Sequence, residues 1–159
     1  MGAYQGIQGR KPTAMLIGLH TLPLDPQGRL ALPAGFRQSL TGRAYLTRGF
    51  ERNLMLLGEQ AFARLCDGLK GTSLTDPAGR QLARLLLGSA VEIELDGNGD
   101  LRLPENLKSF AGLDGQGILL GQGEFIEIWA PVAWEQQASL LEDGQADTER
   151  FSRFQLTLA

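Results

Sequence analysis

The amino-acid sequence predicts an α+β protein, mainly β, in which one folded unit occurs twice. The first observation is an internal repeat: residues 24–33 and 95–104 share Leu, Asp, Gly, Leu, Leu and Pro at matching places. The second is that the same order of strands, turns and helices is expected around both copies. The third is a length of 159 residues with 43% hydrophobic residues, which is enough for a globular core. A repeat of this kind constrains the architecture before any other signal does.

The first unit opens with an apolar stretch that ends in a tight turn. Residues 15–24 are mostly apolar, and Asp25-Pro26-Gln27-Gly28 follows them. Asp, Pro and Gly are the residues that such turns prefer at these positions. Residues 29–32 predict a strand whose leucines share one face. The other expected elements are a helix at about 34–40 that begins after Pro33, strands at 44–47 and 54–57, and a helix at about 59–69.

The second unit repeats this order after a connecting helix. Asp76-Pro77 is typical of a helix start, because Asp caps the helix and Pro suits its first turn. Apolar residues alternate with glutamates over 91–95, which predicts an amphipathic strand. Phe125 and Trp129 share one face of the last expected strand, and we expect them in the core. The remaining expected elements are a turn at 96–99, a strand around 101–103, a helix at 104–110, strands at 118–120 and 125–129, and a helix at 131–141.

These elements divide the chain into five segments. The N-terminal residues are Gly-rich and without periodicity, which predicts a flexible leader. The C-terminal residues are polar with scattered Phe and Leu, which predicts a tail. The segments are the leader over 1–14, a first repeat over 15–70, a linking helix over 71–89, a second repeat over 90–141 and the tail over 142–159.

Composition and charge exclude several classes of protein. Cys66 is the single cysteine, so the chain forms no internal disulfide and fits a reducing compartment. The apolar runs are too short to cross a bilayer, so we expect a cytoplasmic protein without a membrane partner. The net charge is −3, but residues 1–60 balance to +4 and residues 61–159 to −7. Such asymmetry is a weak indication that one end binds a polyanion.

The two copies of the turn differ at one informative position. The first copy has Arg29 where the second has Asp100. Turn construction explains the shared residues, because Asp bonds nearby backbone and Gly accepts a positive φ. These shared residues are Asp25, Gly28, Asp96 and Gly99. A hairpin does not need Arg after the Gly, whereas a protruding guanidinium suits phosphate or guanine edges in a major groove. The alternative for Arg29 is a solvated surface residue.

The repeated pattern Asp-x-x-Gly-Arg-Leu-x-Leu-Pro resembles the MraZ proteins of bacteria, within the wider AbrB-like swapped-hairpin group. Residues 80–90 are similar to the family's linking helix and to the strand start after it. The resemblance covers about 15–141 in order. It implies a double swapped-hairpin AbrB-like barrel, in which one chain does the work of an AbrB-type dimer.

The same resemblance implies a sequence-specific DNA-binding transcriptional regulator of the division and cell-wall gene cluster, which is not an enzyme. Its partners would be double-stranded DNA with direct repeats and further copies of itself in a ring-like homo-oligomer associated with the nucleoid. No catalytic residue, cofactor or metal is expected. The family's DNA-contacting arginine corresponds to Arg29 in this sequence.

The chain departs from the family's pattern in both copies. Many relatives carry a basic residue before the Gly, whereas this chain has Gln27 and Asn98, and Asp100 stands where Arg is expected. Arg102 shares a strand face with Asp100, and it either replaces the missing arginine in DNA binding or pairs with Asp100. These departures leave a second function open, which is a ring-forming protein–protein interaction module with weakened DNA binding.

Other kinds of chemical site fit less well. The spacing of Asp96, Asn98 and Asp100 resembles the start of an EF-hand calcium loop, but Leu101 occupies the place of the required Gly. His20 is the only histidine, and nothing around it supports a nucleophilic site. These patterns therefore indicate structural roles.

Overall fold

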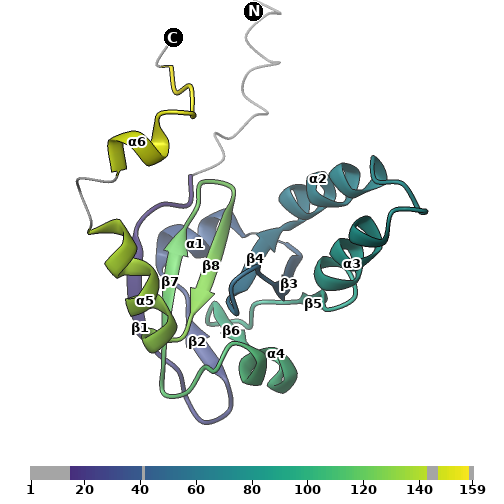
Figure 1. The fold of residues 1–159 in the computed structure, drawn as a ribbon. Helices are drawn as coiled ribbons and strands as arrows, with labels where there is room; N and C mark the ends of the chain where they lie inside the picture. The colour runs from purple at the N-terminus through teal and green to yellow at the C-terminus, as the bar shows by residue number, and fades with distance from the viewer. Residues whose placement is uncertain (1–14, 41, 143–146, 158–159) are drawn as a thin grey trace, which may run out of the picture.

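The computed structural model describes residues 15–40, 42–142 and 147–157. Over these residues the chain is a mixed α+β protein in which short helices surround the strands (Figure 1). The α+β class is therefore confirmed. The leader expected over 1–14 lies outside the described residues, as does part of the tail expected over 142–159.

The strands and helices agree closely with those that the sequence predicts. The strands are β1 (Leu19–Pro23), β2 (Arg29–Ala31), β3 (Ala44–Arg48), β4 (Leu54–Gly58), β5 (Val91–Ile93), β6 (Asp100–Arg102), β7 (Gln116–Gly121) and β8 (Phe125–Trp129). The helices are α1 (Ala34–Ser39), α2 (Glu59–Lys70), α3 (Pro77–Leu86), α4 (Glu105–Phe110), α5 (Pro131–Leu141) and α6 (Asp147–Phe151). Each strand and helix expected between residues 29 and 141 is confirmed, and the boundaries shift by a few residues.

Local sequence explains where the helices begin. The Asp76 carboxylate accepts a hydrogen bond from Ala78 N at 3.0 Å, which caps α3, and Pro77 occupies its first turn. Pro131 occupies the first turn of α5 in the same way. Pro33 and Pro104 precede α1 and α4 at corresponding places of the two copies.

The strands of the two copies are interleaved. The described residues form a six-stranded sheet in the order β1-β7-β8-β4-β3-β5 and a two-stranded sheet of β2 and β6. The pairings β1–β7, β3–β5, β4–β8 and β2–β6 each join one copy to the other. In the larger sheet, β1 corresponds to β5, β3 to β7 and β4 to β8. When each strand is replaced by its counterpart, the same strand order is read in reverse, so the topology has an approximate two-fold symmetry.

The pairing also defines the edges of the larger sheet. Strands β1 and β5 stand at its two ends, and among the described residues no ladder joins them. The structure is therefore an open sequence of paired strands with the β2–β6 pair beside it (Figure 1). Helices α2 and α3 project to one side of this arrangement, and α5 packs on the opposite side near β7.

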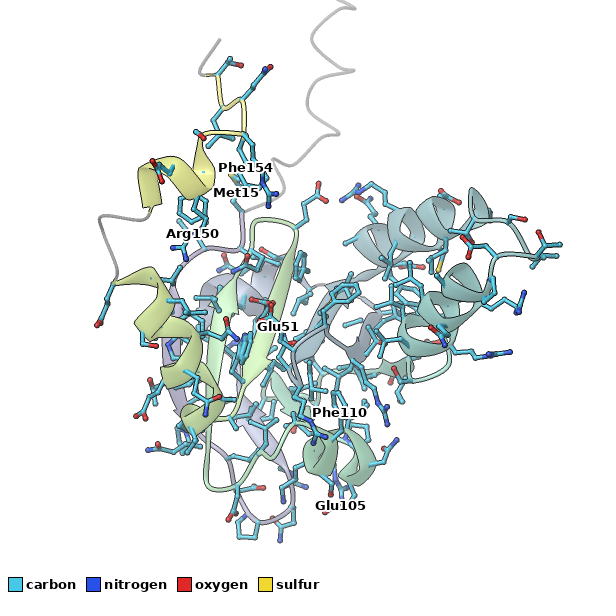
Figure 2. All side chains as sticks on the ribbon, viewed as in Figure 1. Met15, Glu51, Glu105, Phe110, Arg150 and Phe154 are labelled. Atoms are coloured by element: carbon cyan, nitrogen blue, oxygen red, sulfur yellow. The ribbon has the colours of Figure 1, made fainter. Side chains whose placement is uncertain are left out.

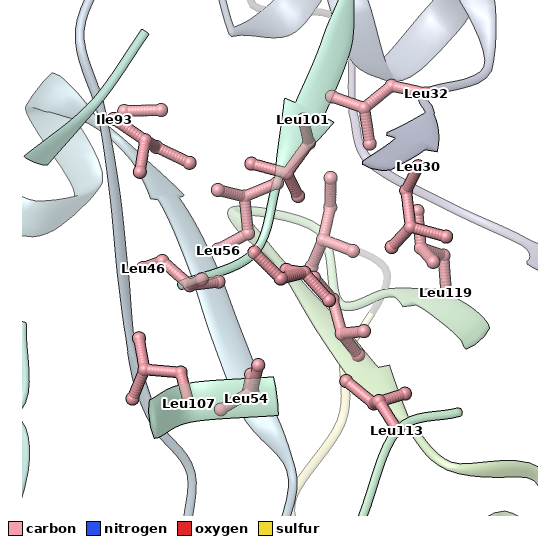
Figure 3. Packing of buried hydrophobic residues seen from close by; sticks show 14 of the residues in the cluster. Leu30, Leu32, Leu46, Leu54, Leu56, Ile93, Leu101, Leu107, Leu113 and Leu119 are labelled. Atoms are coloured by element: carbon pink, nitrogen blue, oxygen red, sulfur yellow. The ribbon is translucent and has the colours of Figure 1, made fainter. Parts of the chain in front are cut away.

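Leucines from both copies form one core. Leu30 of β2 and Leu101 of β6 lie directly opposite each other, and both side chains are 0% exposed. Leu46, Leu56 and Leu119 of the larger sheet belong to the same cluster (Figure 3). Burial of each such side chain contributes about 1.5–3 kcal/mol to stability. The core therefore holds the small sheet against the large one.

One sequence expectation about the core is wrong. Phe125 is only half-buried, and the side chains of β8 that join the central cluster are Ile126 and Ile128. Trp129 is buried, but it packs edge-to-face against Trp134 of α5 at 5.8 Å between ring centroids. Both faces of β8 carry apolar side chains, Phe125 and Trp129 on one and Ile126 and Ile128 on the other, so alternation alone could not identify the core face.

A buried polar contact fastens β8 to the start of β4. The Asn53 side chain is 1% exposed, and its Nδ2 donates to Glu127 Oε2 at 2.9 Å. Its Oδ1 accepts a hydrogen bond from Glu51 N at 3.1 Å. Burial raises the pKa of the Glu127 carboxyl above its ordinary value of 4.5, because desolvation outweighs the hydrogen bonds that favour the charged form. This contact also joins the two copies.

No helix within the described ranges combines the length and the apolar character needed to cross a membrane.

Substitution of Leu101 tests whether the core joins the two sheets. We expect Leu101→Ala to lower the free energy of unfolding by about 2–5 kcal/mol, because it leaves a cavity in a closed core. Leu74 is 87% exposed, so Leu74→Ala should change it by no more than about 0.5 kcal/mol. Urea denaturation of both variants measures the difference. Equal, small effects would contradict the position of Leu101 in the core.

Candidate nucleic-acid interface

The two repeated turns have matching hydrogen bonds. We call residues 25–28 turn 1 and residues 96–99 turn 2. In turn 1, Asp25 Oδ1 accepts hydrogen bonds from Gln27 N and Arg29 N, both at 2.9 Å. In turn 2, Asp96 Oδ1 accepts hydrogen bonds from the backbone N of the equivalent residues, also at 2.9 Å. Each Asp therefore uses its carboxylate to hold its own turn.

The glycine of each turn has a backbone conformation that other residues rarely adopt. Gly28 has φ +82° and Gly99 has φ +78°. Gly28 N donates to Asp25 O at 3.0 Å, and Gly28 O accepts a hydrogen bond from Leu103 N at 2.8 Å. A Cβ atom on Gly28 would lie 3.0 Å from Leu103 O. Turn 1 thus depends on Gly for its φ and for its close contact with the second copy.

The strands that follow the two turns pair with each other. In this β2–β6 ribbon, Arg29 lies opposite Arg102, and Ala31 lies opposite Asp100. The leucines between them point into the core, so these four residues occupy the other face of the ribbon. Because the strands are antiparallel, turn 1 lies at the end that carries Arg29 and Arg102, and turn 2 lies at the end that carries Asp100.

The pairing of β2 with β6 places the side chains of Arg29 and Arg102 next to each other. The hydrogen bond from Leu103 N to Gly28 O makes Gly28 and Leu103 a hydrogen-bonded pair. Arg29 and Arg102 then form the adjacent non-hydrogen-bonded pair, in which opposite side chains lie closest. Both side chains are exposed, and neither forms an ion pair or side-chain hydrogen bond with another described residue. We call these two residues the arginine row.

The turn 2 end of the ribbon carries a different set of charges. Arg37 of α1 reaches turn 2, where its Nη1 donates to Asn98 O at 3.2 Å and its side chain packs on Gly99. An open groove of about 550 Å³ lies beside it, and Glu94 and Asp96 are among its lining residues. Arg37 could not be found from the sequence, because only the interleaving of the copies brings α1 to turn 2.

A second open groove lies beside the arginine row. It has a volume of about 410 Å³ and is lined in part by Gln27, Arg102, Glu94 and Glu105. Glu105 begins α4 in the lower part of the molecule, near the end of the ribbon that carries turn 1 (Figures 1 and 2). No group of three or more His, Cys, Asp or Glu side chains is placed to hold a metal ion within the described residues.

The structure brings some of the expected site residues together and separates others. Arg29 and Arg102 share one row, whereas Asp100, the counterpart of Arg29 in the repeat, lies at the other end of the ribbon. Arg102 and Asp100 do not form an ion pair in the described structure. His20 packs edge-to-face against Phe36 at 5.0 Å between ring centroids, away from the arginine row.

Comparison with known proteins finds one family over most of the chain. A family model described as "MraZ protein, putative antitoxin-like" matches residues 15–85 and again residues 86–154. A protein of Thermomicrobium roseum named transcriptional regulator MraZ is 37% identical over 127 residues, which are 80% of this chain and 89% of that protein. A protein of the same name from Salinispora arenicola is 38% identical over 135 residues, covering 85% and 95%. Its namesake from Herpetosiphon aurantiacus is 35% identical over 141 residues, covering 88% and 99%.

Two glycines of the turns, Gly28 of turn 1 and Gly97 of turn 2, provide a matched test of backbone strain. Gly28→Ala should lower the free energy of unfolding by about 1–2 kcal/mol, because Ala is strained at positive φ and its Cβ approaches Leu103 O. Gly97 has no atom within 4 Å of a Cβ position and no positive φ. Gly97→Ala should therefore leave the stability unchanged or slightly raised. Thermal unfolding of both variants distinguishes them, and equal losses would refute the geometry of turn 1.

Proposed function

The chain belongs to the MraZ family, and from this membership we propose that it is a transcriptional regulator that binds DNA through turn 1 and the arginine row. The family is one of transcriptional regulators, which is not a class of enzyme. The observation that carries the proposal is the arginine row: two exposed guanidinium groups beside a protruding turn, with no protein partner among the described residues.

The interleaved strands support a proposal about the fold as well. Each copy supplies strands that pair only with the other copy, which is the exchange that a swapped hairpin makes. We propose that this arrangement is the double swapped-hairpin barrel of the AbrB-like group, formed within one chain. In such an arrangement the ribbon and its turns form a compact, rigid surface for DNA.

A two-stranded ribbon such as β2–β6 is a kind of element that double-stranded DNA can accommodate. A major groove admits a two-stranded β-ribbon, and Arg is the side chain that most often contacts guanine there or holds a phosphate. Arg29 follows turn 1 directly and is exposed. We propose that Arg29 makes the main contact with DNA and that Arg102 adds a second positive charge beside it.

A ring of several subunits would explain how an acidic chain binds DNA. The net charge is −3, and one ribbon offers few phosphate contacts, so a single subunit would bind weakly and with strong salt dependence. Subunits linked in a ring-like homo-oligomer would bind direct-repeat DNA with an avidity about a hundredfold or more above that of one site. We propose this assembly, on the nucleoid in the cytoplasm, with the division and cell-wall gene cluster as its target.

A second candidate function rests on the acidic end of the ribbon. Asp100 stands at the place of the expected arginine, and neither Gln27 nor Asn98 supplies the basic residue before the Gly. Exposed apolar side chains also occur on α5, where Val132 is 70% and Leu141 60% exposed. A ring-forming protein–protein interaction module with weakened DNA binding would account for these features.

Loss of the Arg29 side chain tests the DNA-binding function. At low and moderate salt, Arg29→Ala should reduce affinity for duplexes carrying short direct repeats by about tenfold or more, because a charge-assisted contact is lost. Arg64 on α2 is an exposed arginine that pairs with Glu124 at 3.4 Å, so Arg64→Ala is a control of equal charge change. Fluorescence anisotropy measures both. Absence of wild-type binding at low salt would favour the second candidate function. Equal binding by Arg29→Ala and the wild-type protein would show that Arg29 is not the DNA contact.

The ring is tested separately by light scattering. At micromolar concentration the wild-type protein and Arg29→Ala should both have the mass of several chains of 17.2 kDa, because the proposal assigns the arginine row to DNA and not to the contact between subunits. A monomer at this concentration would remove the avidity argument. DNA binding by that monomer would then have to come from a single ribbon.

A further inference from the structure

We propose that Arg29 and Arg102 form one clamp that holds a single phosphate group of DNA, so that each subunit contacts the DNA backbone with only the turn 1 end of its ribbon. This inference rests on the proposed function and adds the ligand group, the second arginine and the polarity of the contact. It follows from the register of the β2–β6 ribbon rather than from the repeat.

The register places the second arginine where the repeat would not. The counterpart of Arg29 is residue 100, which lies opposite Ala31 at the far end of the ribbon. An arginine at position 100 would not lie directly opposite Arg29. It would lie diagonally across the ribbon, displaced by two residues, which is about 6.6 Å along the strand. The chain has Asp100 at that position and Arg102 two residues later. This shift moves the second positive charge into the same row as Arg29.

Two guanidinium groups in one row favour an anion between them. Like charges directly opposite each other on a sheet are destabilising, and no described carboxylate pairs with either arginine. An anion bound by both groups relieves this repulsion and gains charge-assisted hydrogen bonds. The Asp25 carboxylate forms no ion pair with either arginine in the described structure, and its Oδ1 accepts hydrogen bonds from Gln27 N and Arg29 N.

The geometry favours a phosphate over a base. A guanine edge is read by one bidentate arginine in the plane of the base, whereas a phosphate offers oxygens to donors from more than one side. Two arginines from neighbouring strands approach from two sides. Glu94 and Glu105 line the groove beside Arg102 and repel an anion from it, so the phosphate is restricted to the exposed face of the ribbon.

The turn 2 end of the ribbon is unsuited to the same contact. The negative charge of Asp100 would repel any phosphate that approaches there, and Glu94 and Asp96 line the adjacent groove. Two described arginines line this groove, and both already have partners. Arg37 Nη1 donates to Asn98 O, and Arg43 pairs with Glu92 at 3.2 Å. The ribbon therefore has a basic end and an acidic end, and only the basic end accepts DNA.

A double-mutant cycle tests the clamp. The probe is a direct-repeat duplex selected from a random pool with the wild-type protein, and the variants are Arg29→Ala, Arg102→Ala and the double variant. Each single variant should lose about tenfold in affinity. The double variant should lose at least about threefold less than the product of the two losses, because both side chains hold one group. Arg64→Ala should bind like the wild-type protein.

Three outcomes can be told apart. Failure of the wild-type protein to select any duplex removes the proposed function and the clamp together. A loss for Arg29→Ala without a loss for Arg102→Ala, or losses that simply multiply, keeps the proposed function and overturns the clamp. Unfolding midpoints without DNA should not fall in any of the variants, because each exposed arginine contributes repulsion and not packing; a fall would assign the losses to folding and overturn the clamp.

Chemical changes in the duplex distinguish phosphate from base. A neutral methylphosphonate at one phosphate of each repeat should weaken wild-type binding about tenfold at a single position and leave the double variant unaffected. Replacement of guanine by 7-deazaguanine removes the N7 acceptor and should not abolish the difference between the wild-type protein and Arg102→Ala. Loss of that difference with 7-deazaguanine, and no sensitive phosphate, would overturn the phosphate clamp in favour of base contacts.

Discussion

The pairing of the two copies is the constraint on which the rest of the structure depends. Strand β1 pairs with β7 and strand β5 with β3, so neither copy contains the partners of its own first strand. The buried Leu30–Leu101 pair adds the apolar contact that holds the ribbon to the larger sheet. Since isolated hairpins are marginally stable in water, each copy needs the other to bury its leucines. The repeat is therefore two halves of one folded body.

Burial of the leucines also determines which residues face the solvent. Side chains alternate along a strand, so the inward direction of Leu30 and Leu101 turns Arg29, Ala31, Asp100 and Arg102 outward. A shift of register by one residue would bury these charges. The same interaction that stabilises the fold thus fixes the face of the ribbon that we propose for DNA. Each turn then fixes where its strand of the ribbon begins, because its Asp and Gly hold the turn in one shape.

The sequence predicted the features that depend on local residues and missed those that depend on pairing between the copies. Asp76-Pro77 predicts the start of α3, and alternation predicts β5, because caps and side-chain period act within a few residues. The opposition of Arg29 and Arg102 comes from the antiparallel pairing of segments that lie far apart in the chain. The contact of Arg37 with turn 2 has the same origin. Phe125 was assigned to the core because both faces of β8 carry large apolar side chains, and the face that joins the core is that of Ile126 and Ile128.

A duplication within one chain permits an asymmetry that a dimer of identical chains cannot have. In a two-fold dimer, any residue at the first position of the ribbon occurs at both ends, so the two ends carry the same charge. Here the two copies differ, so one end of the ribbon carries Arg29 and Arg102 and the other end carries Asp100. A DNA-binding protein with two-fold symmetry matches a palindromic site, because the symmetry of the operator mirrors that of the protein. On the proposed mode of binding, a ribbon with one basic end has a direction along the DNA. The polarity of this ribbon therefore fits the direct repeats that we propose as its target, in which every site has the same orientation, better than inverted ones.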